Sequence, residues 1–253
     1  VMETKTVHIK AISNLGRADD GSYHETQNYA ITESHEPGST FKLVDLIAVL
    51  DDKKADTSTV YDSKGGRIEY YGRSVKDSNG KGYGKISLAR GFELSSNTVL
   101  VQSVYDSYKN NPKQFVDRIN SYGLNKPLGL PIKGEGKPVI PQPGTNRWSG
   151  VALPWMAFGY GLSVTPLQTL TLYNAVANDG VMVKPIFVSE IKEWNKTIKK
   201  YNTEVINPKI CSQETLDKVH AVLENVVKKV TGSKLYSKDF SMAGKTGTAQ
   251  VNY

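Results

Sequence analysis

Apolar side chains recur at helical spacing in several stretches of the chain, and these stretches predict its helices. The most apolar of them runs from Phe41 to Leu50 and is hydrophobic on nearly every side, so it predicts a central, buried helix. Thr165, Pro166 and Gln168 supply an N-cap, a first-turn proline and a capping box for another helix. The predicted helices cover 41–50, 86–94, 97–108, 112–122, 165–178 and 212–230.

Shorter runs of alternating or β-branched residues predict strands at 1–3, 7–15, 181–188, 190–192 and 240–251. Gly16–Ser34 is polar and predicts a surface connection, whereas Asp51–Lys85 is rich in glycine and tyrosine and predicts loops with a hairpin. The proline-rich and glycine-rich segment 125–150 predicts an extended surface excursion. A boundary between two domains is the alternative for that segment.

Composition narrows the class of protein. With 253 residues, 38% of them hydrophobic, the chain can bury the core of one large domain or two small ones. The net charge of +7 is spread over many segments without a series of aromatic residues, so no nucleic acid partner is predicted. Cys211 is the single cysteine, and His24 and His35 lack metal-ligand spacing, so we expect neither a disulfide nor a metal site. The sequence contains no apolar run long enough to cross a membrane and no signal-peptide pattern.

The start of the most apolar helix carries a candidate nucleophile. Pro37 and Gly38 interrupt the chain, so Ser39 is expected at the helix start, where backbone N–H groups suit an anion. Lys42 follows one turn later on the same face, so the hydroxyl and the amine are expected to touch. An apolar environment disfavours the charged form of a lysine, which can then take the proton of the serine. Ser-x-x-Lys is a short pattern that also occurs by chance.

Two later stretches carry further candidate site residues. Ser95, Ser96 and Asn97 lie at the joint between the predicted helices 86–94 and 97–108, where short polar side chains can enter a cleft. The same three residues are also an ordinary helix-capping sequence. Lys245, Thr246, Gly247 and Thr248 lie in the predicted strand 240–251, for which a plain strand with a glycine bulge is the alternative.

Taken in order, the three stretches resemble the three-part signature of penicillin-binding proteins and class A β-lactamases. The amino-acid sequences of residues 36–42, 95–97 and 243–250 are similar to those of the motifs in the transpeptidase domain of class B penicillin-binding proteins. The resemblance covers essentially the whole chain. It implies an α+β fold of the penicillin-binding and β-lactamase-like type, in which an antiparallel sheet is flanked by helices and joined by an all-helical subdomain.

The resemblance also implies a domain organisation. Residues 1–253 would form one transpeptidase domain, with a membrane anchor and a non-catalytic stalk belonging before Val1. The strand that bears Lys245 is followed in the family by further sheet strands and a C-terminal helix, so the domain is expected to be C-terminally incomplete, with those strands missing.

Four residues acquire catalytic roles from the resemblance. Ser39 would attack the carbonyl of a D-alanyl-D-alanine stem peptide and form an acyl-enzyme, with Lys42 as the base. Ser95 would carry the proton to the leaving D-alanine, assisted by the charge of Lys245. The acyl group would then pass to an amine of a neighbouring stem peptide, which makes a peptidoglycan cross-link.

Four further residues acquire substrate-binding roles. Asn97 would hydrogen-bond the amide chain of the substrate, and the hydroxyls of Thr246 and Thr248 would hold its terminal carboxylate. Gly247 lets the backbone approach the substrate closely. The oxyanion would be held by backbone N–H groups of Ser39 and Thr248.

The resemblance further implies partners and a location. Stem peptides ending in D-alanyl-D-alanine would be the substrate, and β-lactam antibiotics would acylate the same serine. A membrane glycosyltransferase and proteins of the division or elongation machinery are the expected partners, with division and elongation both open. The domain would lie on the extracytoplasmic, periplasmic side of the cytoplasmic membrane, without a cofactor.

Two other functions fit the same motifs. A class A β-lactamase needs a Glu-x-x-Leu-Asn sequence, which does not occur between Asn97 and Lys245, and class D enzymes usually have an aliphatic residue at the position of Asn97. A β-lactam sensor that is acylated once and then signals remains an alternative, although all the polar members of the site are present.

Overall fold

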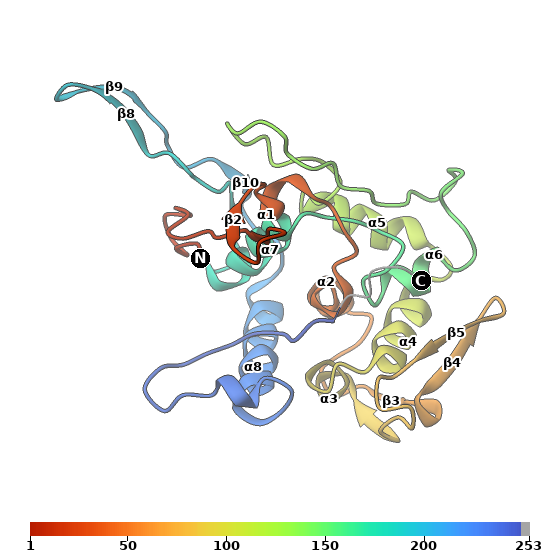
Figure 1. Cartoon of the computed structure of the whole chain (residues 1–253). Helices are drawn as coiled ribbons and strands as arrows, with labels where there is room; N and C mark the ends of the chain where they lie inside the picture. The colour runs from red at the N-terminus through yellow and green to blue at the C-terminus, as the bar shows by residue number, and fades with distance from the viewer. Residues whose placement is uncertain (249–253) are drawn as a thin grey trace. The chain divides into compact units, whose positions relative to one another are not determined.

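The computed structural model describes residues 1–248 of the chain (Figure 1). The chain divides into two compact units, each assembled from separate segments. The first comprises 1–35, 120–139 and 164–210, and the second comprises 36–119, 140–163 and 211–253. The chain enters each unit more than once, and within the segment 125–150 it passes from the first unit to the second between residues 139 and 140. The assignment of 1–253 to one transpeptidase domain stays a prediction.

Helices and short strands alternate along the described residues. The α-helices are α1 Tyr29–Thr32, α2 Lys42–Asp51, α3 Leu88–Glu93, α4 Asn97–Tyr108, α5 Pro112–Ser121, α6 Ala152–Met156, α7 Pro166–Ala177 and α8 Gln213–Lys229. The 3-10 turns are η1 Gly38–Thr40, η2 Lys64–Gly66 and η3 Ser233–Leu235. The strands are β1 Leu15–Arg17, β2 Tyr23–Glu25, β3 Val60–Asp62, β4 Arg67–Tyr70, β5 Arg73–Lys76, β6 Lys85–Ser87, β7 Met182–Val183, β8 Glu190–Glu193, β9 Lys196–Lys200 and β10 Val205–Asn207.

The strands pair two by two. Within residues 1–248 they form antiparallel pairs β1–β2, β3–β6, β4–β5, β7–β10 and β8–β9. The predicted α+β class is confirmed, with separate strand pairs in the described residues in place of one continuous sheet. The long predicted helices are also confirmed, with ends within a few residues of those expected.

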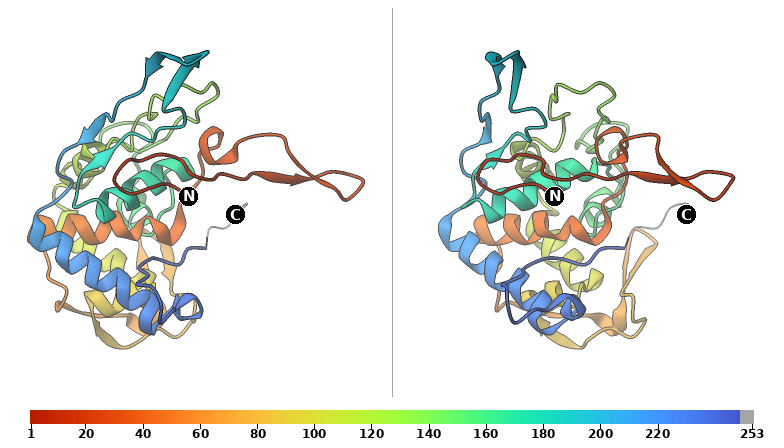
Figure 2. Two further views of the ribbon diagram at one scale, coloured as in Figure 1. Left: turned by 90° about the vertical axis from the view of Figure 1, so that its left-hand side faces the viewer. Right: turned by 60° about the vertical axis from the view of Figure 1, so that its left-hand side comes forward.

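Helix α2 is the core of the second unit. All of its residues from Lys42 to Leu50 are buried, as its continuous apolar composition predicts. It packs against α4 and α8, and Figure 2 shows α2 (orange) and α8 (blue) running side by side. Each large aliphatic side chain buried there contributes roughly 1.5–3 kcal/mol. Helix α2 is therefore a firm base for the residues at its N-terminal end.

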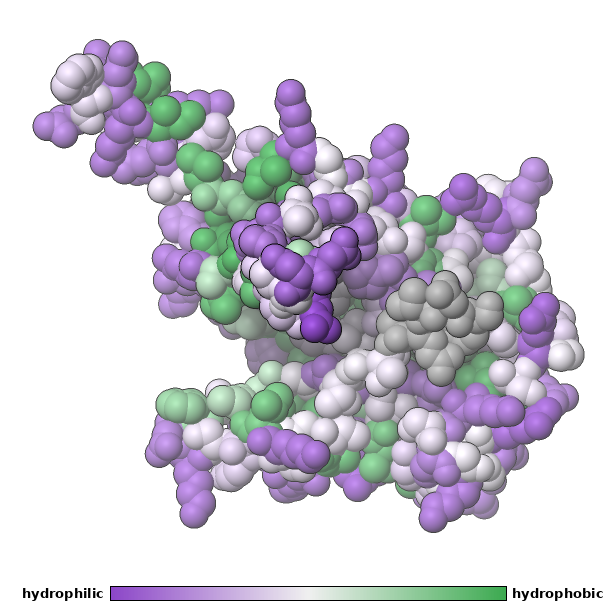
Figure 3. Space-filling view, viewed as in Figure 1, coloured by the Kyte–Doolittle hydropathy of each residue, from purple (hydrophilic) through white to green (hydrophobic). Residues whose placement is uncertain are grey.

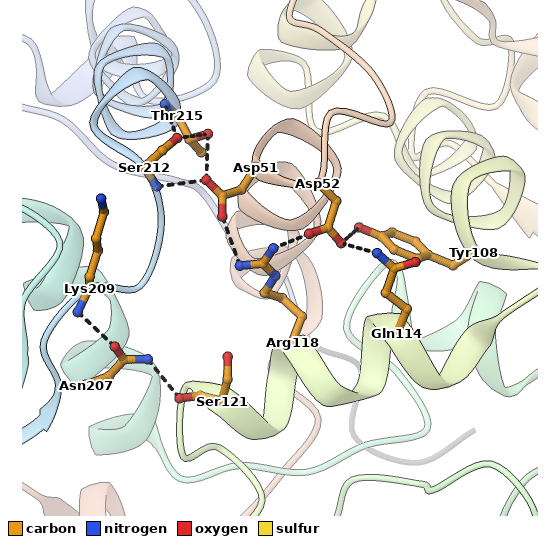
Figure 4. Close-up of polar contacts among 10 residues, drawn as sticks. All are labelled: Asp51, Asp52, Tyr108, Gln114, Arg118, Ser121, Asn207, Lys209, Ser212 and Thr215. Carbon is orange, nitrogen blue, oxygen red and sulfur yellow. Dashed lines mark hydrogen bonds and ion pairs between the residues drawn. The ribbon is translucent and has the colours of Figure 1, made fainter.

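A polar cluster fixes the other end of α2 (Figure 4). Asp51 and Asp52 end the helix, where negative charge is unfavourable to the helix dipole. Arg118 of α5 forms ion pairs with both carboxylates, at 2.9 Å to Asp51. Tyr108 donates to Asp52 at 2.8 Å, and the backbone N–H of Ser212 donates to Asp51 at 2.8 Å. Burial raises the pKa of Asp51, but the hydrogen bonds from Ser212 and Thr215 and the Arg118 charge outweigh burial and hold it below its usual value.

Helix α7 in the first unit has the predicted capping box. The Thr165 hydroxyl accepts from the N–H of Gln168 at 3.2 Å, and the Gln168 side chain accepts from the N–H of Thr165 at 2.9 Å. The β8–β9 hairpin of this unit carries both hydrophilic and hydrophobic side chains on its surface, at the upper left of Figure 3. Trp194 at its turn is 95% exposed.

Two strand predictions near the N-terminus are wrong. Residues 1–14 form isolated bridges and no strand, since Met2 bridges Ile9 and the backbone around His8 pairs with Ile186. The segment 16–34 is more than a surface connection, since β2, α1 and most of β1 lie in it. Their side chains are mostly exposed, so hydrophobic alternation gives no signal for them.

The strand predicted at 240–251 is also wrong over its described part. Residues 240–248 form no regular element, and residues 249–251 lie outside the described residues. A strand is stable only with a pairing partner, and no described segment pairs with 240–248. In residues 1–248, no helix has the length and apolar composition needed to cross a membrane, and no cluster of His, Cys, Asp and Glu suits a metal ion.

Candidate active site

Ser39 lies in the 3-10 turn η1, immediately before α2. The turn is held by the segment 158–161. The N–H of Gly38 donates to the carbonyl of Gly159 at 3.0 Å, and the N–H of Gly161 donates to Glu36 at 2.8 Å. Gly159 has a φ of +85°, and a Cβ there would lie 2.0 Å from the carbonyl oxygen of Gly38, so only glycine fits. Ser39 is thus presented on a rigid turn at the head of the core helix.

Lys42 lies one turn further on and is fully buried. Its Nζ atom contacts the carbonyl oxygen of Ser95 at 2.8 Å, the Ser95 hydroxyl at 3.3 Å and Oδ1 of Asn97 at 2.5 Å. The structure therefore joins the first motif to the second. The hydrogen bond expected between Lys42 and Ser39 is absent from the described contacts, because the amine is turned toward the second motif.

Burial and charge set the protonation of the two site lysines. Burial lowers the pKa of Lys42 well below its usual value, and the positive charge of Lys245 lowers it further, while Asp45 and Asp77 act in the opposite direction. Burial also lowers the pKa of Lys245 to about 8. At neutral pH Lys245 therefore remains mostly an ammonium, and Lys42 loses its proton more readily than an exposed lysine does.

The second motif occupies the joint between α3 and α4. Ser95 has a positive φ of 58°, which turns the chain sharply there. Ser96 is the N-cap of α4, and its hydroxyl accepts from the N–H of Val99 at 3.2 Å. Ser96 is therefore the helix cap that one interpretation predicts, while Ser95 and Asn97 contact Lys42, and their site roles stay predictions.

Asp77, which sequence reasoning missed, anchors this joint. It follows β5 and is 3% exposed. Its carboxylate accepts from the Ser96 hydroxyl at 3.0 Å, from the N–H of Thr98 at 3.0 Å and from the Thr98 hydroxyl at 2.9 Å. The neighbouring carbonyl of Lys76 accepts from the Asn97 side chain at 2.7 Å. The end of the β4–β5 hairpin thus positions the second motif.

The third motif runs beside the first as an irregular segment. A Cβ on Gly247 would lie 2.7 Å from Cγ2 of Thr40, the residue after Ser39, so the backbone approaches the nucleophile turn closely. The Thr246 hydroxyl hydrogen-bonds that of Thr231 at 3.1 Å. Nζ of Lys245 lies 5.6 Å from the centre of the Phe92 ring and donates to the carbonyl oxygen of Thr246 at 2.9 Å.

A single cavity of about 1000 Å³ joins the motifs. Six predicted site residues line it, namely Ser39, Ser95, Asn97, Thr246, Gly247 and Thr248. Lys42 contacts the cavity residues Ser95 and Asn97 through its amine, and Lys245 is half-buried. The lining also includes the basic residues Arg73 and Lys76 and the aromatic residues Trp155, Phe158 and Tyr160. Sequence reasoning did not point to Arg73, Lys76 or Trp155, because ordinary strand and helix residues carry no spacing that marks a cleft.

Comparisons with known proteins agree with the geometry. A family model described as the penicillin-binding protein transpeptidase domain matches residues 1–253. The chain is 27% identical to Stage V sporulation protein D of Bacillus subtilis (strain 168), over 98% of this chain and 39% of that protein. It is 28% identical to peptidoglycan D,D-transpeptidase FtsI of Escherichia coli (strain K12), over 88% of this chain and 35% of that protein. The chain therefore spans less than half the length of these curated relatives.

Solved structures give the same result. The D,D-transpeptidase domain of a peptidoglycan glycosyltransferase from Eggerthella lenta has a TM-score of 0.81 and 29% identity, covering 89% of this chain and 56% of that one. Penicillin-binding protein 3 from Mycobacterium tuberculosis in complex with aztreonam has a TM-score of 0.77 and 28% identity, covering 92% of this chain and 53% of that one.

Proposed function

Because the chain belongs to the penicillin-binding protein transpeptidase family, we propose that it is the catalytic part of a serine D,D-transpeptidase that cross-links peptidoglycan. The observation that supports this most strongly is the shared cavity, in which residues of all three motifs meet around Ser39. The buried amine of Lys42 contacts Ser95 and Asn97 of the second motif and so links that motif to helix α2.

Acylation follows from the positions of three groups. The Ser39 oxygen attacks the carbonyl of the penultimate D-alanine, and its proton passes to Lys42 as the new O–C bond forms. In the neutral amine, two N–H groups satisfy the Ser95 carbonyl and Asn97, which leaves the lone pair for that proton. The Ser95 hydroxyl, 3.3 Å from Nζ, can then relay a proton to the departing D-alanine as the C–N bond breaks.

Substrate recognition rests on the third motif and on Asn97. Lys245 is charged below pH 8 and attracts the terminal carboxylate, which the hydroxyls of Thr246 and Thr248 hold. Asn97 binds the amide chain of the substrate. The close approach of Gly247 to Thr40 supports an oxyanion hole made by the N–H groups of Ser39 and Thr248.

The second half-reaction transfers the acyl group from Ser39 to an amine of a neighbouring stem peptide. A β-lactam acylates the same serine. Because no amine acceptor then releases the acyl group, the adduct persists. We place the reaction on the extracytoplasmic side of the cytoplasmic membrane, with an anchor supplied by a segment outside this chain. A glycosyltransferase and division or elongation proteins are the proposed partners. The relatives named as D,D-transpeptidases favour this function over a β-lactamase or a sensor.

Turnover of a D-alanyl-D-alanine thioester analogue with an added amine acceptor tests the proposal. Steady release of thiol together with an aminolysis product is expected from the parent protein, and Ser39→Ala and Lys42→Ala should each lose it. Ser189→Ala, an exposed serine of the first unit, is the matched control and should keep parent activity. A single burst of thiol without turnover would indicate a sensor, and rapid hydrolysis of penicillin would indicate a β-lactamase. Either result would overturn the proposal.

A further inference from the structure

Asp45 is an ionisable residue in the core for which neither the fold nor the three motifs account. It lies on α2 and is fully buried. Within the described residues, neither of its carboxyl oxygens has a hydrogen-bond partner. A buried polar group without a partner costs about 1–3 kcal/mol, and more if it is charged. An apolar residue would therefore serve the packing of α2 better, so the carboxyl needs another explanation.

The position of Asp45 relative to Lys42 supplies one. The two residues are three apart on the same helix, a spacing that brings side chains together on one face, with about 5–6 Å between their Cβ atoms. Burial raises the pKa of Asp45 well above its usual value and the charge of Lys42 lowers it, so the carboxyl ionises most readily when Lys42 carries a proton. The charges that act on Lys42 are those of Lys245, Asp45 and Asp77. Of the helices packed against α2, α4 brings Tyr108, which donates to Asp52, and α8 brings His220 at the edge of its apolar stripe.

We propose that Asp45 is a positioning residue that acts through Lys42, offsetting the positive field of Lys245 when the amine takes the proton of Ser39. This inference rests on the proposed function. As Ser39 forms its bond to the substrate carbonyl, its O–H bond breaks and an N–H bond forms on Lys42, which creates an ammonium inside the core. Burial and Lys245 both oppose that ammonium, and a carboxyl one turn away favours it. A base works best when its pKa lies near the working pH, so Asp45 keeps a deeply buried lysine from becoming too weak.

The pH profile of penicillin acylation separates this role from packing. Asp45→Asn keeps the shape and removes the ionisable group, and Asp45→Val removes both polar atoms. In both variants the acidic limb of the profile should move about one pH unit lower, which is about 1.4 kcal/mol in proton affinity. The plateau rate should fall about tenfold, because a weaker base transfers the proton less well. Asp19→Asn, at an exposed carboxyl, is the control and should leave the profile unchanged.

A second readout makes the outcome independent of turnover. Titration of Lys42 by NMR in protein labelled at the lysine side-chain carbon should show the same downward move of its pKa in both variants. If the acidic limb of the pH profile and the pKa of Lys42 both match the parent in either folded variant, the role of Asp45 is overturned. The transpeptidase proposal would stay intact. A parent protein that penicillin does not acylate would overturn the proposed function, while the titration would still decide whether Asp45 controls Lys42.

Discussion

Replacing Asp77 by alanine should loosen the second motif and slow acylation together. The carboxylate is 3% exposed and accepts hydrogen bonds from the Ser96 hydroxyl and from the N–H and hydroxyl of Thr98. Ser96 caps α4, and its neighbours Ser95 and Asn97 contact Lys42. The substitution therefore removes the acceptor that fixes this joint without touching a predicted site residue.

The structure sets the size of the effect. The hydroxyls of Ser96 and Thr98 lie 3.2 Å apart and can turn toward each other when the carboxylate is gone. The N–H of Thr98 lies in the first turn of α4, where it has no partner within the helix, so it is left buried and unsatisfied. One such donor costs about 1–3 kcal/mol, and a hydrogen bond to a charged acceptor is worth about 1.5–3 kcal/mol. We expect a loss of about 2–4 kcal/mol in the free energy of unfolding.

Urea denaturation and the second-order rate of penicillin acylation give the two readouts. A displacement of about 1 Å at Ser95 and Asn97 should lower the acylation rate about 100-fold. Asp77→Asn keeps one acceptor oxygen and should lie between Asp77→Ala and the parent in both measurements, and Asp19→Ala should match the parent. Parent-like stability and acylation in Asp77→Ala would refute the claim that this carboxylate holds the motif.

Two further predictions concern the third motif. Gly247→Ala places a Cβ 2.7 Å from Thr40 and should slow acylation at least about tenfold, whereas Gly244→Ala meets its nearest neighbour at 3.9 Å and should stay within about twofold of the parent. Equal rates in these two variants would contradict the close approach at Gly247. Lys245 is an ammonium below its pKa of about 8 and neutral above it, so acylation should fall as the pH rises through that value. Lys245→Arg stays charged and should remove this alkaline fall, and a fall that persists in Lys245→Arg would assign it to another group.

Local patterns predicted the elements that local physics determines. The continuous apolar run of α2 can only be buried, and the capping box at Thr165 uses atoms within one turn, so both were readable in the sequence. The three motifs could also be recognised from the order and identity of a few neighbouring residues each, and the structure brings six of their residues to one cavity.

Contacts between distant segments were not predictable. Nothing near Asp77 indicates that the end of the β4–β5 hairpin meets the start of α4, because that contact depends on how the two segments pack. The opposite error occurred at Phe240–Thr248, where small and β-branched residues predict a strand but no described segment pairs with it. The Lys42 amine shows the same limit, since helical spacing placed it near Ser39 and could not show that Ser95 and Asn97 would take its hydrogen bonds.

The site of penicillin attachment tests the central claim most directly. After incubation with penicillin, the intact mass should rise by one adduct, and peptide mass spectrometry should place that adduct on Ser39. Ser39→Ala should take up none, while Ser95→Ala should still be modified on Ser39 at a lower rate, because Ser95 only relays a proton. An adduct on any other residue, or labelling of Ser39→Ala at the rate of the parent, would contradict the assignment of Ser39 as the nucleophile.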